Sequence, residues 1–245
     1  MFAMDVVWMR PERAARGPKP AHSRDEIAAA CVRVADTEGL VAVSMRRVAT
    51  ELGTGTTSLY RYVASKEDLF DLMVDQAFGS VSLPGQTKYW RDDLRLLASW
   101  KRALILEHPW MASLSGRPAV GPHGLAVQES GLRALEGWGL SIDEMTIIVE
   151  SLDAYVYGYV VRELAERAAT QRSGQDLDAW MAAHDAYART VIESRRFPLV
   201  ARVWLDAREP HAADRAERGF WHGLDLLLDG YSAGMRRARE RSGRR

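Results

Sequence analysis

The sequence predicts an all-α fold, with an N-terminal three-helix bundle that contains a helix-turn-helix and a larger C-terminal helical domain. Apolar residues recur at helical spacings of three and four from Ser23 onward. No stretch alternates apolar and polar residues between Asn-Gly or Asp-Gly turns, which argues against strands. Helix-capping residues, glycines and prolines mark the ends of the helical segments.

The composition favours a soluble globular protein. Of 245 residues, 47% are hydrophobic and 27% are charged, which excludes a wholly disordered chain. Acidic and basic residues are equal in number at 33 each, so net charge provides no general attraction to nucleic acid or membrane. A single cysteine, Cys31, excludes an internal disulfide, and neither a signal peptide nor a membrane-spanning run is recognisable. We therefore expect a cytoplasmic protein that does not engage membranes.

The spacing of punctuating residues predicts four parts. They are a flexible basic arm over 1–22, a helix-turn-helix domain over 23–79, a larger helical domain over 90–235, and a basic tail over 236–245.

The first helix begins at Ser23, whose side chain suits an N-cap. Glu26 stands three residues later and completes a capping box. Gly39 ends the helix. Cys31 lies on its apolar stripe, so we expect a small buried side chain rather than a redox-active thiol.

The next segment contains the helix-turn-helix. Ser44 caps a short helix, and Gly53 ends it and permits a tight turn. A second short helix is expected over 54–62, and Ser65 caps a third. A short helix, a glycine turn, a second short helix and a supporting helix are typical of this motif.

The second helix of such a motif lies in the DNA major groove, with its first residues at the base edges. Thr56, Thr57 and Ser58 are short enough to let the backbone approach and carry hydroxyls for bases or phosphates. Longer aromatic and basic side chains nearby suit phosphate and sugar contacts. The candidate DNA-binding residues are Arg46, Thr56, Thr57, Ser58, Tyr60, Arg61, Tyr62 and Lys66.

A second interpretation stays open at this point. Residues 1–70 carry ten basic and nine acidic side chains, which is a weak electrostatic footprint for DNA. The motif also occurs in proteins that never touch DNA. The alternative is therefore a helical interaction or sensor protein that does not bind DNA sequence-specifically.

The order and spacing of these residues resemble the DNA-binding domain of TetR-family repressors over about fifty residues. The matching runs are 23–30, 35–40, 44–49, 52–55, 58–63 and 65–69. The resemblance implies a homodimeric repressor, a double-stranded DNA operator of inverted symmetry, and release by a small-molecule effector. It also places Thr56 to Ser58 at the bases, Tyr60, Tyr62 and Lys66 at the DNA backbone, and Arg46 at a base or phosphate. Tyr62 stands where histidine is frequent in the family.

The C-terminal half reads as longer helices around a broken central segment. Residues 110–124 hold several glycines and prolines and predict a loop with at most one helical turn. Ser141 caps the longest helix, which is apolar nearly all round between Met145 and Val161 and is expected to be buried on several sides. The remaining expectations are helices over 91–108, 125–136, 177–194 and from about 214, a turn at 197–199, a mobile loop over 206–214, and a frayed tail.

Aromatic residues in this half predict a pocket for a small apolar or aromatic effector. The candidate ligand-binding residues are Trp100, His108, Trp110 and Tyr155; the alternative for each is core or dimer packing. The half also resembles the tetracycline-repressor subgroup, which implies that 90–235 is a ligand-binding and dimerisation domain and that helices 141–168 and 214–234 pair across a dimer. Ser113 stands where those repressors use a metal-holding histidine, so a metal–tetracycline ligand is not expected.

No sequence motif indicates an enzyme. The chain lacks a Gly-x-Ser-x-Gly elbow, a P-loop and a dinucleotide-binding glycine fingerprint. No two histidines have metal-ligand spacing. We expect no catalytic residues, no cofactor and no metal.

Overall fold

The computed structural model describes residues 6–10, 22–174, 179, 182–207 and 214–242, with side chains as far as Arg237. All of its regular elements are helical, which confirms the predicted fold class within these residues. The chain divides into two compact units, one of residues 1–157 with 235–245 and one of residues 158–234.

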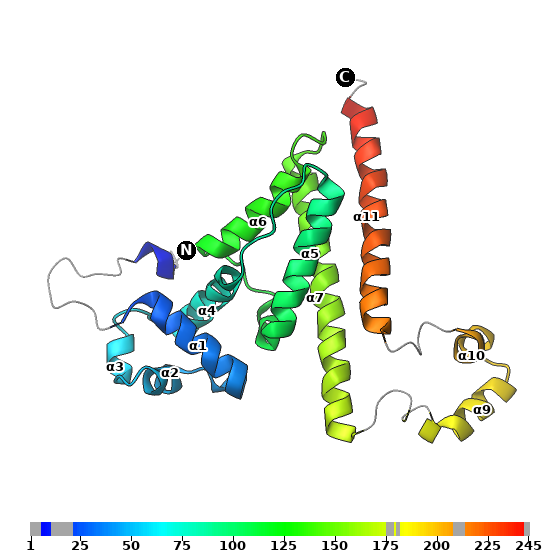
Figure 1. Cartoon of the computed structure of the whole chain (residues 1–245), viewed down its shortest axis with the longest axis horizontal. Helices are drawn as coiled ribbons and strands as arrows, with labels where there is room; N and C mark the ends of the chain where they lie inside the picture. The colour runs from blue at the N-terminus through cyan, green and yellow to red at the C-terminus, as the bar shows by residue number, and fades with distance from the viewer. Residues whose placement is uncertain (1–5, 11–21, 175–178, 180–181, 208–213, 243–245) are drawn as a thin grey trace. The chain divides into compact units, whose positions relative to one another are not determined.

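The first unit opens with a four-helix assembly (Figure 1). Its members are α1 (Arg24–Glu38), α2 (Met45–Glu51), α3 (Thr56–Leu59) and α4 (Lys66–Ser80). The Ser23 side chain accepts a hydrogen bond from the Glu26 amide, and Glu26 accepts one from the Ser23 amide, so the capping box is confirmed. Ser44 and Ser65 cap α2 and α4 as predicted.

The turn between α2 and α3 depends on a glycine. Gly53 has φ +65°, a left-handed conformation that costs a glycine little and other residues more. The amide of Thr54 then donates to the carbonyl of Ala49 at 2.9 Å, which closes the turn. The helix after it is shorter than the predicted 54–62, because α3 ends at Leu59 and residues 60–62 form a turn.

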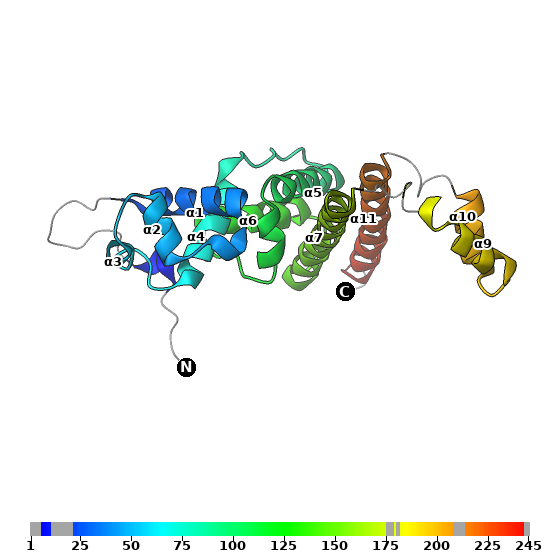
Figure 2. The ribbon, with the colours of Figure 1, turned by 90° about the horizontal axis from the view of Figure 1, so that it is seen from below.

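The rest of the first unit surrounds α4. It contains α5 (Trp90–Glu107), η3 (Pro109–Leu114), α6 (Pro122–Leu135) and the first half of α7 (Ile142–Ser173). As Figures 1 and 2 show, α4 lies between α1 and α6, and α6 also packs on α5. The helix α4 therefore belongs to the core of the predicted DNA-binding domain and also contacts the predicted ligand-binding domain.

The N-terminal segment is more ordered at one end than the prediction of a flexible arm allowed. Residues 7–9 form the short helix η1 (Val7–Met9), which packs against α4, and Val7 is fully buried. Arg10 donates to the Asp68 carboxylate at 2.5 Å. Burial alone would raise the pKa of Asp68, but hydrogen bonds from Arg10 and the Ala64 amide outweigh it and lower that pKa. Residues 1–5 and 11–21 of the predicted arm lie outside the described residues.

The second unit contains the end of α7, then α9 (Asp185–Glu193), α10 (Pro198–Asp206) and most of α11 (Arg215–Ser242). The sequence predicted one helix over 177–194 and only a turn at 197–199. Within that range α9 begins at Asp185, and residues 179, 182 and 183 are helical too. Pro198 starts a further helix, α10, because proline is well placed in a first turn. Figure 2 shows α9 and α10 side by side. Residues 208–213 of the predicted loop are not described.

The end of α11 also differs from the prediction. Its backbone stays helical to Ser242, seven residues into the predicted frayed tail. Earlier in the helix, Phe220, Leu224 and Leu228 recur at a spacing of four and are fully buried, so one face of α11 packs within the chain. Arg215 of α11 binds Glu166 of α7 at 2.8 Å within the second unit.

The longest helix, α7, begins as predicted, with Ser141 and Glu144 exchanging capping hydrogen bonds. Its burial is one-sided in the single chain. Val149 and Leu152 are buried, whereas Ile147 is 62% exposed. The prediction of burial on several sides is therefore not met within one subunit, and an apolar face of α7 is left uncovered.

Among the described residues, none of the helices combines the length and apolar character needed to cross a membrane.

We predict that Cys31 does not react in the folded protein. The residue is fully buried, and burial raises the pKa of its thiol to about 12, so thiolate is scarce at pH 8. A disulfide reagent such as DTNB should label the native chain at least about a hundredfold more slowly than the chain in guanidinium, because only unfolding exposes the thiol. Equal rates would show that α1 is not packed as described.

Candidate DNA interface and ligand pocket

The helix-turn-helix exposes most of the predicted DNA-binding side chains. Tyr60 is 57% exposed, and Arg46, Thr57, Arg61 and Lys66 are exposed too. Thr56 and Ser58 are half-buried at the start of α3, with their side chains partly accessible. These seven residues come from α2, α3, the following turn and the first position of α4. They supply the hydroxyl, aromatic and cationic groups that a major-groove reader uses.

The acidic residues of this region are engaged within the protein. Glu38 and Glu51 bind Arg47 at 2.6 Å and 3.0 Å. Glu67 pairs with Arg117, and Asp68 pairs with Arg10. Arg46, Arg61 and Lys66, by contrast, have no carboxylate partner within the part of the chain that the structure describes.

These ion pairs explain why the small net charge of residues 1–70 does not describe the exposed surface of the motif. The four carboxylates near the motif are neutralised by arginines that lie on or beside it, and three cationic side chains remain available on the exposed surface. A counted net charge near zero thus coexists with a surface suited to phosphate contacts.

Tyr62 does not share that surface. Only 8% of it is exposed, and its hydroxyl accepts a hydrogen bond from the His22 amide at 3.3 Å. Tyr62 lies in the turn that follows α3, where its amide donates to the Leu59 carbonyl at 2.9 Å, and in this turn its side chain is buried. In the free protein, Tyr62 anchors the start of α1, contrary to the exposed phosphate-contact position that the sequence predicted.

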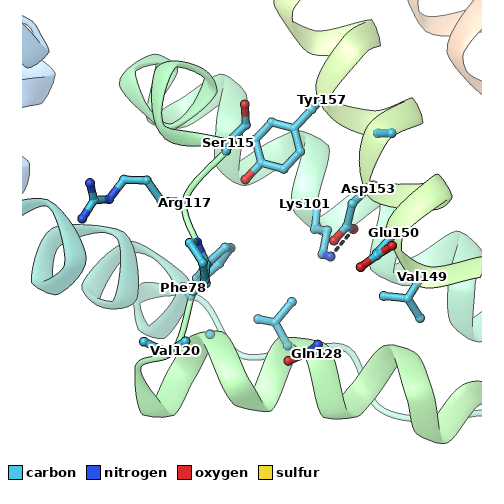
Figure 3. Close-up of a pocket in the computed structure, with 16 residues that line it drawn as sticks. Phe78, Lys101, Ser115, Arg117, Val120, Gln128, Val149, Glu150, Asp153 and Tyr157 are labelled. Carbon is cyan, nitrogen blue, oxygen red and sulfur yellow. Dashed lines mark hydrogen bonds and ion pairs between the residues drawn. The ribbon is translucent and has the colours of Figure 1, made fainter. Parts of the chain in front are cut away.

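A pocket of about 600 Å³ lies in the first unit (Figure 3). This volume is within the usual range for small-molecule sites. Its walls come from α4, α5, α6, α7 and the segment 115–120 between η3 and α6. Apolar lining residues include Phe78, Val120, Val127 and Val149.

The polar groups of the pocket gather on α5 and α7. Lys101, only 5% exposed, forms an ion pair with Asp153, as the dashed line in Figure 3 marks. Glu150 and Tyr157 flank Asp153 on α7 at spacings of three and four, and therefore share its face. Burial, assisted by the Asp153 carboxylate, raises the pKa of Tyr157 to about 12, so its phenol stays protonated.

The four aromatic residues predicted to bind ligand do not line this pocket. The α5 residue that lines the pocket is Lys101, next to Trp100 in sequence, and the α7 residues are Val149, Glu150, Asp153, Ala154 and Tyr157, which leave out Tyr155. Trp100 supports the wall from behind, with its ring stacked on Phe78 at 6.1 Å between centroids. Tyr155 is half-buried beside the lining face.

His108 and Trp110 serve another contact. Both are buried, and both meet Asp36 of α1: Trp110 Nε1 donates to its Oδ1 at 2.7 Å, and His108 Nδ1 lies 2.9 Å from the same oxygen. These residues join η3 and the end of α5 to the helix-turn-helix domain. The sequence analysis listed both as candidate ligand-binding residues; in this structure their side chains contact Asp36, and neither lines the pocket.

A second contact between the same regions is made by Asp75 of α4. Its Oδ1 accepts hydrogen bonds from the amides of His123 and Gly124, both at 2.9 Å, and its Oδ2 lies 3.0 Å from His123 Nδ1. Asp75 thus caps α6 from another helix, because the N-cap residue of α6 is Gly121, which has no side chain. A Cβ on Gly121 would lie 2.2 Å from Asp75 Oδ1, so glycine is needed for the carboxylate to approach.

A third contact holds the pocket segment itself. Arg117 donates to Asp71 of α4 at 2.6 Å and also pairs with Glu67. Its neighbours in the segment line the pocket. We call the contacts of Asp36, Asp71 and Asp75 the three clamps; together they tie the pocket walls to α1 and α4.

Sequence reasoning missed the polar pocket residues, although a signal was present. Lys101 occupies the apolar stripe of α5, between the buried Leu97 and Leu104. A charge on such a stripe needs a partner, and Asp153 is one of two acidic residues in the apolar run of the longest helix. Pairing these two would have indicated the pocket.

Within the described residues, no group of three or more histidine, cysteine, aspartate or glutamate side chains is arranged to hold a metal ion.

Comparison with known proteins finds a matching family model for each half of the chain. Residues 27–73 match the family model described as "Bacterial regulatory proteins, tetR family". Residues 83–235 match the model described as "Tetracyclin repressor-like, C-terminal domain".

Individual proteins of the same kind are also similar to this chain. The transcriptional repressor DrrR1 of Streptomyces coeruleorubidus is 36% identical over 231 residues, which is 93% of this chain and 83% of that protein. The crystal structure of apo ActR from Streptomyces coelicolor has a TM-score of 0.72 and 25% identity, over 91% of this chain and all of that one. ActR in complex with actinorhodin has a TM-score of 0.70 at 24% identity, over 87% of this chain and 97% of that one.

We predict that Asp75→Ala destabilises the first unit by about 3 kcal/mol, since it leaves two helix-terminal amides without their charged acceptor. Urea unfolding followed by tryptophan fluorescence measures the change. Asp92→Ala, which removes an exposed carboxylate from α5, is the control and should cost less than about 1 kcal/mol. Equal effects of the two substitutions would show that the Asp75 clamp contributes nothing specific.

Proposed function

Because this chain belongs to the TetR family of bacterial transcriptional regulators, we propose that it is a homodimeric repressor that binds a palindromic operator and is released by a small-molecule effector. The family shows that the chain is a DNA-binding transcriptional regulator. The repressor role, the dimer and the effector are the parts we propose. We expect no catalytic activity and no required cofactor.

The observation that carries the proposal is the connection between the exposed helix-turn-helix and a pocket of about 600 Å³ through α4. One end of α4 carries Lys66, a candidate DNA contact, and the other carries Phe78, which lines the pocket. A protein that only bound DNA would not need this cavity. A protein that only bound a ligand would not need the exposed cations of the motif.

We propose that an effector acts by moving the clamped elements. It would occupy the space between α7 and the segment 115–120, and push on the start of α6. Because Asp75 and Asp71 fix that region to α4, a shift of α6 would tilt α4 and the recognition helix α3 with it. The effector must bind the DNA-incompetent arrangement more tightly than the competent one for release to follow.

Uncovered apolar side chains support a dimer through the long helices. On α7, Ile147 and Val161 are 62% and 46% exposed, and on α11, Leu226 is 59% exposed. Apolar groups at several positions along two long helices favour a helix-packing interface with a second copy. In such a dimer each subunit would present one α3 to one half-site.

The DNA interface is tested by two kinds of substitution. Tyr60→Ala and Lys66→Ala should weaken binding to all sequences, and Lys66→Ala should reduce the slope of log affinity against log salt by about 1. Thr56→Ala and Ser58→Ala should instead change which bases are preferred. Fluorescence anisotropy with operator variants measures both, and an unchanged preference in Thr56→Ala and Ser58→Ala would refute this placement of α3.

The function itself is tested by selecting bound DNA from a random pool at two salt concentrations. We expect an enriched inverted repeat, bound more weakly at the higher salt because releasing counterions into a more concentrated salt solution gains less entropy. No enrichment at either salt would contradict the proposal and would favour the helical interaction protein that does not bind DNA sequence-specifically.

A further inference from the structure

The charges that face the pocket do not balance. Lys101 and Asp153 neutralise each other. Arg117 also belongs to the lining, but Figure 3 shows its side chain directed away from the cavity, and its guanidinium binds Asp71 and Glu67 of α4. Glu150 therefore adds a negative charge that no cation of the pocket offsets.

Glu150 is placed to meet a ligand. It stands three residues before Asp153 on α7, and in Figure 3 both carboxylates lie beside Lys101 at one end of the cavity. Glu150 makes no hydrogen bond or ion pair within the described residues. An unpaired carboxylate at the wall of a pocket, beside another carboxylate, favours a positive charge between them.

The opposite end of the pocket has a different character. Phe78 and Val120 lie across the cavity from the carboxylates in Figure 3, and the Phe78 ring is backed by Trp100. A flat apolar group placed here would be in contact with an aromatic wall. Between the two ends, Gln128 and the protonated phenol of Tyr157 offer neutral hydrogen bonds.

We infer that the effector carries a protonated amine on an apolar, aromatic body, with the amine bound by Glu150 and Asp153 and the ring system against Phe78. This inference rests on the proposed function, in which the ligand of the pocket is the effector. It adds that this effector is positively charged. A charge-assisted hydrogen bond from an ammonium group would give the exposed Glu150 carboxylate a cationic partner in place of water.

The same geometry disfavours an anionic ligand. An anion could bind here only by taking Lys101 from Asp153, which would leave Asp153 and Glu150 close together without a counter-charge. Asp153, whose side chain is 35% exposed, would then lose its ion pair with the buried Lys101, which is unfavourable. The pocket therefore distinguishes ligands by charge as well as by shape.

Three probes that share one ring system test the inference on the full-length protein. They are aminomethylanthracene, its N-acetyl amide and anthracene carboxylate, which are cationic, neutral and anionic at pH 7. Isothermal titration calorimetry should give a Kd for the amine at least about tenfold lower than for the amide, equivalent to about 1.4 kcal/mol, with the carboxylate weakest. Tightest binding of the carboxylate, or equal binding of all three, would overturn the inference.

The variants Glu150→Gln and Glu136→Gln assign the effect to the pocket. Glu150→Gln should abolish the preference for the amine over the amide, because it removes the charge and keeps the shape. Glu136→Gln makes the same change at an exposed position outside the pocket and should leave the preference intact. Retention of the preference in Glu150→Gln would overturn the assignment to this carboxylate.

Operator binding by the wild-type protein separates this inference from the proposed function. If the amine binds preferentially but the protein selects no operator, the charge of the pocket is as inferred and the proposed repressor function fails. If an operator is selected and the amine has no preference, the repressor function stands and the inference fails.

Discussion

The arrangement of the first unit depends on one carboxylate, that of Asp75. It is 8% exposed, and it completes the N-terminus of α6, a helix whose own N-cap is a glycine. Four amides at a helix start need acceptors, and here two of them obtain theirs from α4. The helix that borders the ligand pocket therefore cannot keep its first turn satisfied without staying in contact with the helix that supports the DNA-binding motif.

The other two clamps also hold the ligand-binding region against the helix-turn-helix domain. Asp36 receives His108 and Trp110 from the end of α5 and η3, and Asp71 receives Arg117 from the pocket segment. In each case a carboxylate of the helix-turn-helix domain meets a donor of the ligand domain. A ligand that moves these donors acts on hydrogen bonds that are individually worth about 1.5–3 kcal/mol, which is comparable with a typical allosteric coupling free energy.

The pairing of charged side chains differs between the DNA-binding motif and the ligand pocket. Near the motif, acidic side chains are paired with arginines, and Arg46, Arg61 and Lys66 remain on the surface. In the pocket, the pairing is incomplete and Glu150 is left over. Neither feature is visible in the net charge of the chain, because a count of residues does not show which charges are neutralised by a neighbour.

Local signals in the sequence predicted much of the fold. Ser23, Ser44, Ser65 and Ser141 each cap a helix as their spacing indicated, since capping depends on residues three positions apart. The pocket was predicted less well. Its composition depends on which side of α5 and α7 faces inward, and on long-range pairs such as Lys101 with Asp153, 52 residues apart. Tyr62 was predicted to be an exposed phosphate contact from its place in the motif, whereas the turn after α3 leaves its side chain only 8% exposed in the free protein.

If an effector releases the operator by moving the clamped elements, the Asp75 contact is intact in the DNA-bound arrangement, and hydrogen–deuterium exchange can follow it. Exchange would be followed by mass spectrometry in a peptide spanning 120–128, with and without the selected operator, and in a peptide spanning 198–206 as a reference. The account predicts slower exchange in 120–128 on operator binding and no change in 198–206. Slower exchange in α3 with unchanged exchange in 120–128 would contradict it.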